Sequence, residues 1–198
     1  MFTGIIEAVG EIKKVISLEN GIRIEISPGR LDLSDVHVGD SIATNGVCLN
    51  IITLVGGMIS MDVSRETLNC TRGLEIQGQR VNLEKSMRLS DRINGHLVNG
   101  HVDGIGKVVK IELKGESRLL VIKAPVSLMK YIAKKGSITV NGVSLTVNLI
   151  VKDEFRVNLI PHTLAMTTLQ DLKTDTKVNL EVDMLARYLE QLLSTASK

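Results

Sequence analysis

The chain contains one nine-residue phrase twice, and the two copies lie about half its length apart. Residues 41–49 read SIATNGVCL and residues 137–145 read SITVNGVSL, which agree at six of nine positions with an offset of 96 residues in a chain of 198. The same offset aligns residues 1–10 with residues 97–106. Further matched segments are residues 67–68 with 163–164 and, after a slip of one residue, 81–84 with 178–181. A match of this length indicates a duplicated domain rather than a solenoid, which would need shorter and more numerous units.

Both halves carry short runs of Ile, Val and Leu, separated by Gly, Asn and Asp at intervals of about 8 to 12 residues, which is typical of an all-β barrel or sandwich. The runs in the first half are residues 4–16, 21–26, 40–43, 47–55, 58–62 and 80–83. Those in the second half are residues 100–113, 118–122, 137–140, 143–151, 154–159 and 177–182. Strands this short bury their edges best by closing the sheet. We therefore expect an all-β fold of two similar six-stranded Greek-key β-barrels in tandem.

Two Asn-Gly pairs, Asn45-Gly46 and Asn141-Gly142, stand between alternating apolar runs. Such pairs predict tight hairpins because both central residues must adopt positive φ. Short helices or turns are expected between other strands, at residues 34–37, 65–69, 127–133 and 163–169.

The pattern changes after the second repeat, where apolar residues recur at intervals of three and four. They are Met184, Leu185, Tyr188, Leu189, Leu192 and Leu193. This spacing predicts an amphipathic C-terminal α-helix with no counterpart in the first half. Its apolar stripe either packs on its own barrel or mediates self-association. The expected domains are thus residues 1–88, 89–183 and 184–198.

Composition excludes several classes of protein. A net charge of +2, with two Phe and two Tyr, provides neither the basic surface nor the stacking aromatics of a nucleic-acid-binding barrel. The start of the chain lacks the pattern of a signal peptide, and no apolar run reaches the length of a membrane span. We therefore expect a cytoplasmic protein without membrane partners, in which Cys48 and Cys70 are free thiols.

The segment from Gly95 to Gly106 is densest in reactive residue types. His96 and His101 have no further His or Cys at a metal-ligand spacing, so no metal site is expected. The last two glycines of this segment, Gly104 and Gly106, are not followed by the third glycine of a dinucleotide-binding loop and do not lie in a βαβ unit. His101 stands where the first repeat has Ile5. It is either a half-buried histidine bonded to a carbonyl or a proton carrier.

Ser144 and Thr146 share one face of their strand, and Cys48 and Asn50 are their equivalents in the first half. Ser144, His101 and Asp183 supply the residue types of a hydrolase triad, but the nucleophile elbow of that class is missing. Matched positions that differ between the repeats are Phe2 and Val98, Ile5 and His101, Cys48 and Ser144, Asn50 and Thr146, and Glu66 and His162. Two similar pockets with small differences suit a reaction between two identical molecules.

The sequence resembles the riboflavin synthase family of trimeric two-barrel enzymes over nearly its whole length. The matching segments are MFTGI at 1–5, the doubled Asn-Gly-Val-Cys/Ser-Leu phrase, GHLVNGHVD at 95–103, LMKYI at 128–132 with KKG at 134–136, LIPHTL at 159–164 and VNLEVD at 178–183. The resemblance implies the last step of riboflavin biosynthesis. In that step, one 6,7-dimethyl-8-ribityllumazine donates a four-carbon unit to another, giving riboflavin and 5-amino-6-ribitylamino-uracil. No metal or organic cofactor is implied.

The same resemblance implies a homotrimer, held together by the C-terminal helix. Its active site would form between the first barrel of one subunit and the second barrel of its neighbour. Lumazine synthase is a further expected partner.

The resemblance also implies roles for individual residues. Expected to be catalytic are Ser144, His101, Thr146, Cys48 and Phe2. Expected to bind substrate are Thr3, Gly4, Ser41, Asn50, Asp62, Ser64, Thr67, His96, Gly100, Lys135, Ile160 and Asp183. Ser144 and Thr146, with His96, His101, Lys135, Ile160 and Asp183, belong to the lumazine of the second barrel. Ser41, Cys48, Asp62, Ser64 and Thr67 line the other half, which Phe2 and Thr3 close.

One position departs from the family, because Leu49-Asn50-Ile51 stands where Leu-Thr-Val is frequent. The alternative function is a non-catalytic lumazine or flavin carrier of the same architecture. The retained Phe2-Thr3-Gly4, His101, Ser144 and Thr146 favour the enzyme.

Overall fold

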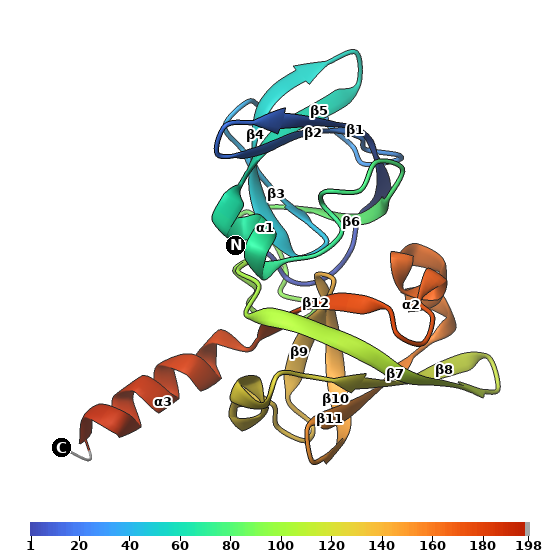
Figure 1. Ribbon diagram of the computed structural model, residues 1–198, viewed down its shortest axis with the longest axis vertical. Coiled ribbons are helices and arrows are strands. Elements are labelled where there is room, and N and C mark those ends of the chain that lie inside the picture. The colour runs from blue at the N-terminus through green and yellow to red at the C-terminus, as the bar shows by residue number, and fades with distance from the viewer. Residues whose placement is uncertain (197–198) are drawn as a thin grey trace.

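The computed structural model describes residues 1–196 and contains two closed, antiparallel, six-stranded barrels, one above the other in Figure 1. The first consists of β1 (Ala8–Leu18), β2 (Gly21–Ser27), β3 (Ser41–Thr44), β4 (Val47–Val55), β5 (Met58–Ser64) and β6 (Arg80–Lys85). The second consists of β7 (Gly104–Lys114), β8 (Ser117–Lys123), β9 (Ser137–Val140), β10 (Val143–Val151), β11 (Glu154–Leu159) and β12 (Lys177–Val182).

The two barrels have the same strand order. The first runs β1-β2-β5-β4-β3-β6, and the second runs through the equivalent strands in the same cyclic order. In each, the last strand pairs with both the first and the third strand and so closes the sheet. The predicted fold class, two tandem Greek-key barrels, is confirmed. Short helical elements fill the connections: α1 (Arg65–Cys70), η1 (Val126–Tyr131), α2 (Pro161–Met166) and η2 (Thr168–Asp171).

Each barrel has its own core of Ile, Val and Leu, but one residue from each half belongs to the other core. Ile6 packs into the core of the second barrel, whereas Val102 packs against that of the first. Correspondingly, β1 and β7 begin at Ala8 and Gly104, about four residues later than the apolar pattern predicts. We call residues 2–6 and 98–102 the exchanged segments, because each leaves its own half to cover the other.

The Asn-Gly hairpins are confirmed and meet at the contact between the barrels. Asn45 and Asn141 have φ of 47° and 48°, and Gly46 and Gly142 both have φ of 81°. A Cβ on Gly46 would lie 2.7 Å from the backbone nitrogen of Gly142. The turns can therefore touch only as glycines.

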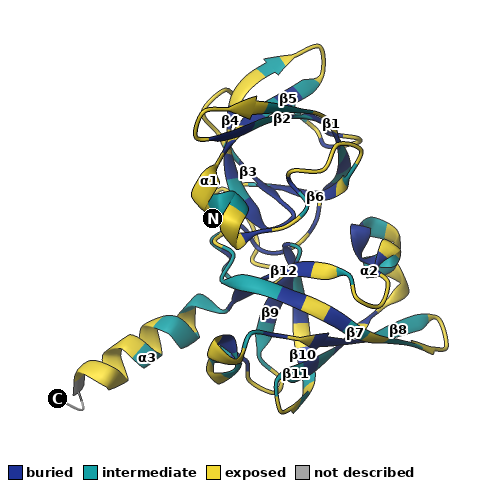
Figure 2. Cartoon of the chain, viewed as in Figure 1, coloured by how far each residue is buried: buried dark blue, intermediate teal, exposed yellow. Residues whose placement is uncertain are grey.

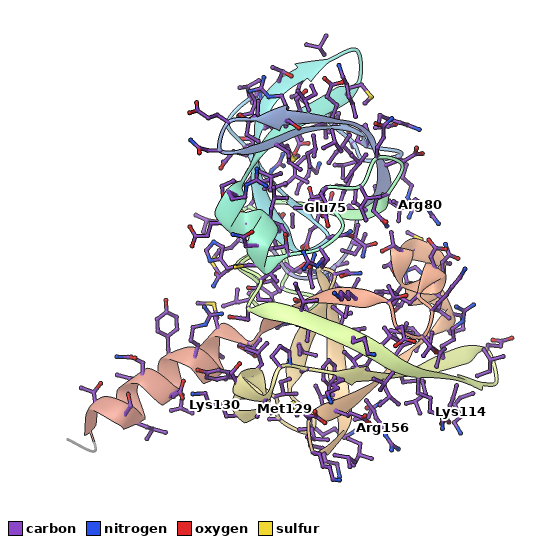
Figure 3. The ribbon with its side chains drawn as sticks, in the orientation of Figure 1. Glu75, Arg80, Lys114, Met129, Lys130 and Arg156 are labelled. Carbon is purple, nitrogen blue, oxygen red and sulfur yellow. The ribbon has the colours of Figure 1, made fainter. Side chains whose placement is uncertain are left out.

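Two further asparagines connect the hairpins across the same contact. Asn82 Nδ2 donates to the carbonyl of Asn141 at 2.9 Å, and Asn179 Nδ2 donates to that of Asn45 at 3.1 Å. An exposed ion pair of 2.6 Å between Arg80, in the first barrel, and Asp171, in η2, adds to this contact (Figure 3).

The C-terminal helix α3 (Met184–Ala196) extends away from the second barrel (Figure 1) and is mostly exposed along its length (Figure 2). Leu185, Leu189 and Leu192 are 58–69% exposed. Packing of the stripe on its own barrel, one of the two predicted arrangements, is therefore wrong. Polar contacts hold the helix instead, since Glu190 accepts from Lys130 and Tyr131 of η1 (Figure 3).

Candidate active site

The exchanged segments meet each other between the barrels. Phe2 and Val98 form an antiparallel bridge, in which the Phe2 N–H donates to Val98 O at 2.7 Å and the Val98 N–H donates to Phe2 O at 3.0 Å. Both side chains are buried, together with Ala43 and the partly buried Cys48. Phe2 therefore lies beside Cys48 of the first barrel.

Each exchanged segment hydrogen-bonds to the polar strand of the opposite barrel through a glycine. The Ser144 N–H donates to Gly4 O, and the Cys48 N–H donates to Gly100 O, each at 2.8 Å. Gly4 and Gly100 have φ of 77° and 79°, and a Cβ on either would lie within 2.7 Å of the Cβ of its Ser144 or Cys48 neighbour. Only glycine allows so close an approach. The two repeats thus build equivalent sites with Ser in one and Cys in the other.

Ser144 has a histidine partner, but it is not His101. The Ser144 Oγ lies 2.7 Å from Nδ1 of His96, a half-buried side chain whose backbone N–H donates to Thr3 O at 3.2 Å. The His96 Nε2 is buried and has no hydrogen-bond partner among residues 1–196. Burial lowers the pKa of His96, and the nearby Asp183 carboxylate partly opposes this effect. A neutral imidazole at this position can accept a proton through Ser144.

His101 lies on the other exchanged segment, directly after the glycine that contacts Cys48. Its side chain is exposed, so the half-buried interpretation is wrong. The repeat offset of 96 residues matches His101 to Ile5, but it leaves His96 with no counterpart in the first half. Comparing the repeats therefore drew attention to His101, whereas His96 was predicted as a site residue only from the family resemblance.

On the first barrel, the Asn50 amide donates to Gly39 O at 3.1 Å and to Ser41 Oγ at 3.2 Å. Asn50 and Ser41 are cross-strand neighbours, as are Thr146 and Ser137 in the second barrel. Thr146 is exposed. The longer Asn50 side chain thus reaches across the pair to hold the Ser41 hydroxyl.

Three other predicted residues of the first half bind neighbouring protein groups. The Asp62 carboxylate accepts two hydrogen bonds from Arg23 at 2.7 and 2.9 Å, and this guanidinium holds the pKa of Asp62 below its usual range. Ser64 caps α1 by accepting from the Thr67 N–H at 3.1 Å, and the hydroxyls of Ser64 and Thr67 lie 3.0 Å apart.

The remaining predicted residues lie on separate elements of the second barrel. Lys135 has φ of 69° and donates its N–H to Val147 O at 2.7 Å. Ile160 is the exposed N-cap residue of α2, and Asp183 accepts from the Leu185 N–H at 3.0 Å at the start of α3. None of these contacts joins them to Ser144.

Two buried glutamates hold the exchanged segments, and sequence reasoning did not single them out. Glu84 accepts from the N–H groups of Thr3 and Gly4, at 2.7 and 3.0 Å, and from the Thr3 hydroxyl at 2.8 Å. Glu181 accepts in the same way from three consecutive N–H groups beginning at Asn99. The available signal was a glutamate at the end of the repeated Val-Asn-Leu-Glu phrase, directly after a leucine in each half.

Burial raises the pKa of both carboxyl groups, to about 7 for Glu181, although the N–H donors oppose the increase. The described residues contain no cluster of His, Cys, Asp and Glu suited to a metal ion. Nor does any helix within residues 1–196 have the length and apolar character of a membrane span.

Comparison with known proteins relates this arrangement to ligand-binding barrels. The family model of the lumazine binding domain matches twice, at residues 3–86 and 99–183. The riboflavin synthase of Photobacterium leiognathi is 45% identical over 98% of this chain and 89% of that protein. The chain belongs to the riboflavin synthase family. The Bacillus subtilis member of this family is 39% identical over the whole chain and 92% of its own length.

Solved structures agree with the family. LumP complexed with riboflavin superimposes with a TM-score of 0.85 at 26% identity, covering 92% of this chain and 99% of that protein. LumP complexed with 6,7-dimethyl-8-(1'-D-ribityl) lumazine gives a TM-score of 0.82 at 27% identity and the same coverage. The synthases are thus much closer in sequence than LumP.

Proposed function

We propose that this chain is a riboflavin synthase, a transferase that dismutes two 6,7-dimethyl-8-ribityllumazine molecules. One molecule donates a four-carbon unit and becomes 5-amino-6-ribitylamino-uracil, and the other becomes riboflavin. Family membership at 45% identity supports this reaction. The observation that carries it is the hydrogen bond of 2.7 Å between Ser144 Oγ and His96 Nδ1, at the position where the first barrel has Cys48.

The chemistry needs a base for the acidic 7-methyl group of one lumazine and hydrogen bonds for the anion that develops. In our proposal, Ser144 passes the methyl proton to the neutral His96, which returns it later in the reaction. Around that lumazine we place Thr146, Lys135, Ile160 and Asp183, and the Ser144 strand is positioned by Thr3 and Gly4.

The second molecule would contact Phe2, Ser41, Cys48, Asn50 and Gly100, with His101 at the edge of its site. The same site would include Asp62, Ser64 and Thr67.

A non-catalytic lumazine or flavin carrier is the alternative, favoured by the LumP complexes with riboflavin and lumazine. Incubating the purified chain with the lumazine, without added metal or cofactor, separates the two functions. A riboflavin synthase produces riboflavin absorbance and green fluorescence with a stoichiometry of one product per two lumazines. A carrier binds the lumazine and leaves it unchanged.

The proposal includes assembly into a homotrimer through the apolar stripe of α3, whose Leu185, Leu189 and Leu192 are exposed. The reacting lumazines would then lie between barrels of neighbouring subunits. Light scattering should give the mass of three chains, whereas a Leu189→Glu variant should sediment as a single chain. Association with lumazine synthase and a cytoplasmic location stay predictions, as do the domain boundaries at residues 88 and 183.

A further inference from the structure

The side chain of Glu181 is the least exposed carboxylate near the exchanged segments, at 2% of the residue's surface. Its Oε1 accepts from the Asn99 N–H at 2.8 Å, and its Oε2 accepts from the N–H groups of Gly100 and His101, each at 3.0 Å. Three consecutive backbone donors therefore converge on one carboxylate of β12, in the second barrel.

The segment held by Glu181 packs on the other barrel, at the site around Cys48. Gly100 accepts from the Cys48 N–H, and its Cα lies so close that an added Cβ would meet Cys48 at 2.7 Å and Phe2 at 3.0 Å. Val102 packs against the core of the first barrel. A movement of these residues would thus change what covers Cys48.

We propose that Glu181, in its ionised form, is a positioning residue for the first-barrel site around Cys48. Its carboxylate fixes residues 99–101 against Cys48, and its protonation releases them. The inference rests on the proposed function for its effect on catalysis, but the release itself can be measured without turnover.

The ionised form is required because the three donors need acceptors on both oxygens. A protonated carboxyl carries an O–H on one oxygen. This hydrogen faces the backbone N–H groups on that side, so at least one hydrogen bond is lost. An unpaired buried N–H is costly, so the segment would then shift toward solvent or toward other acceptors.

The groups around Glu181 determine where this change occurs. Burial raises its pKa to about 7, and the negative charge of Asp103 adds to the increase. Asp103 itself accepts from the Val182 N–H at 2.8 Å and is paired with Arg187 of α3. Thr139 of β9 donates to the backbone carbonyl of Glu181 at 3.5 Å. The exposed His101 follows Gly100, whose N–H group donates to Glu181. Glu84 differs from Glu181 because one of its three donors is the Thr3 hydroxyl and only two are backbone N–H groups.

The direct test is the alkylation rate of Cys48 by iodoacetamide in a Cys70→Ser background, since Cys70 is exposed. At about pH 8, where Glu181 is mostly ionised, Glu181→Gln should label Cys48 at least about threefold faster than the parent, because the amide offers only one acceptor oxygen. Glu116→Gln, on the exposed turn between β7 and β8, is the matched control and should label at the parent rate.

The second test is the pH dependence of riboflavin formation. The wild-type rate should fall about tenfold per pH unit below about pH 7, as expected when a single ionised group is required. Glu181→Gln should be slower at about pH 8 and should lack this transition. Asp103→Asn should move the transition to lower pH, since it removes the like charge and keeps an acceptor for the Val182 N–H.

Equal Cys48 labelling in Glu181→Gln and the parent, with an unchanged pH transition, would overturn the inference. If circular dichroism shows that Glu181→Gln does not fold, Asp103→Asn decides, and an unmoved transition overturns the inference. A wild-type chain that forms no riboflavin would instead refute the proposed function, and the Cys48 labelling would still test Glu181.

Discussion

At the scale of single residues, the pair that matters most for the proposed chemistry is His96 and Ser144, whose polar atoms lie 2.7 Å apart. Desolvation lowers the pKa of the imidazole, so at neutral pH it is mostly unprotonated and able to accept a proton,. Its second nitrogen, Nε2, is buried without a partner among the described residues. A buried polar atom left unpaired is uncommon in a native protein and is often found where a ligand or water binds.

Because one proton would pass along this pair, His96 and Ser144 should behave as a single unit. We expect His96→Gln and Ser144→Ala each to lower kcat by roughly 10²-fold, the usual contribution of a positioned proton carrier. The double variant should be no slower than the worse single variant. Steady-state kinetics on the lumazine check this, with His37→Gln, at an exposed surface position, as the control. Multiplying effects in the double variant would mean that the two side chains act independently.

At the scale of elements, the two Asn-Gly hairpins bring β3-β4 and β9-β10 into contact by the close approach of Gly46 and Gly142. Gly142 and Gly57 have similar φ angles, 81° and 75°. They differ in surroundings, because a Cβ on Gly142 would lie 2.8 Å from the nitrogen of Gly46, whereas one on Gly57 would meet nothing within 4 Å. Substituting alanine at each of these two glycines therefore separates the free-energy cost of the backbone conformation from that of the close approach.

We expect Gly57→Ala to lower the free energy of unfolding by about 1 kcal/mol, the cost of a non-glycine residue at positive φ. Gly142→Ala should lower it by a further 1–3 kcal/mol or so, because the added methyl group must separate the hairpins. Urea denaturation measures both values. Equal losses would show that the hairpin contact contributes nothing beyond the turn conformation.

At the scale of the whole molecule, the exchanged segments make each barrel dependent on a piece of the other half. Ile6 fills the second core, Val102 covers the first, and the two segments pair through Phe2 and Val98. The arrangement is nearly two-fold symmetric, since Gly4 meets Ser144 as Gly100 meets Cys48. The first half alone therefore lacks residues 98–102, which cover its barrel. Residues 2–6 of a second copy of the first half can take their place.

A fragment of residues 1–94 should accordingly form a dimer, in which Gly4 of each copy accepts from Cys48 of the other and Ile6 takes the place of Val102. Analytical ultracentrifugation should give the mass of two fragments, and removal of residues 1–6 should abolish the association. A folded, monomeric 1–94 fragment would contradict the interpretation of the exchanged segments as a mutual cover.

The internal repeat was sufficient to predict the barrels, their strand number and both hairpins, because period-two patterns and Asn-Gly turns are local signals. Exchange of the segments was not predictable in this way. In the sequence, Ile5 and Ile6 continue the apolar pattern of β1. They leave the first barrel because the N–H groups of Thr3 and Gly4 donate to the distant Glu84. His96 was predicted only from the family resemblance, because it precedes the second copy and has no counterpart in the first half. The apolar stripe of α3 was equally compatible with two arrangements.

The exchanged segments also have a consequence for how such a protein can evolve. Each half of the gene encodes a segment that packs on the barrel of the other half, so a substitution selected in one half alters the surroundings of the other. Hybrids joined at the midpoint of two related genes would combine mismatched segments and barrels. Functional chimeras should instead arise when residues 1–6 travel with the second half and residues 98–102 with the first.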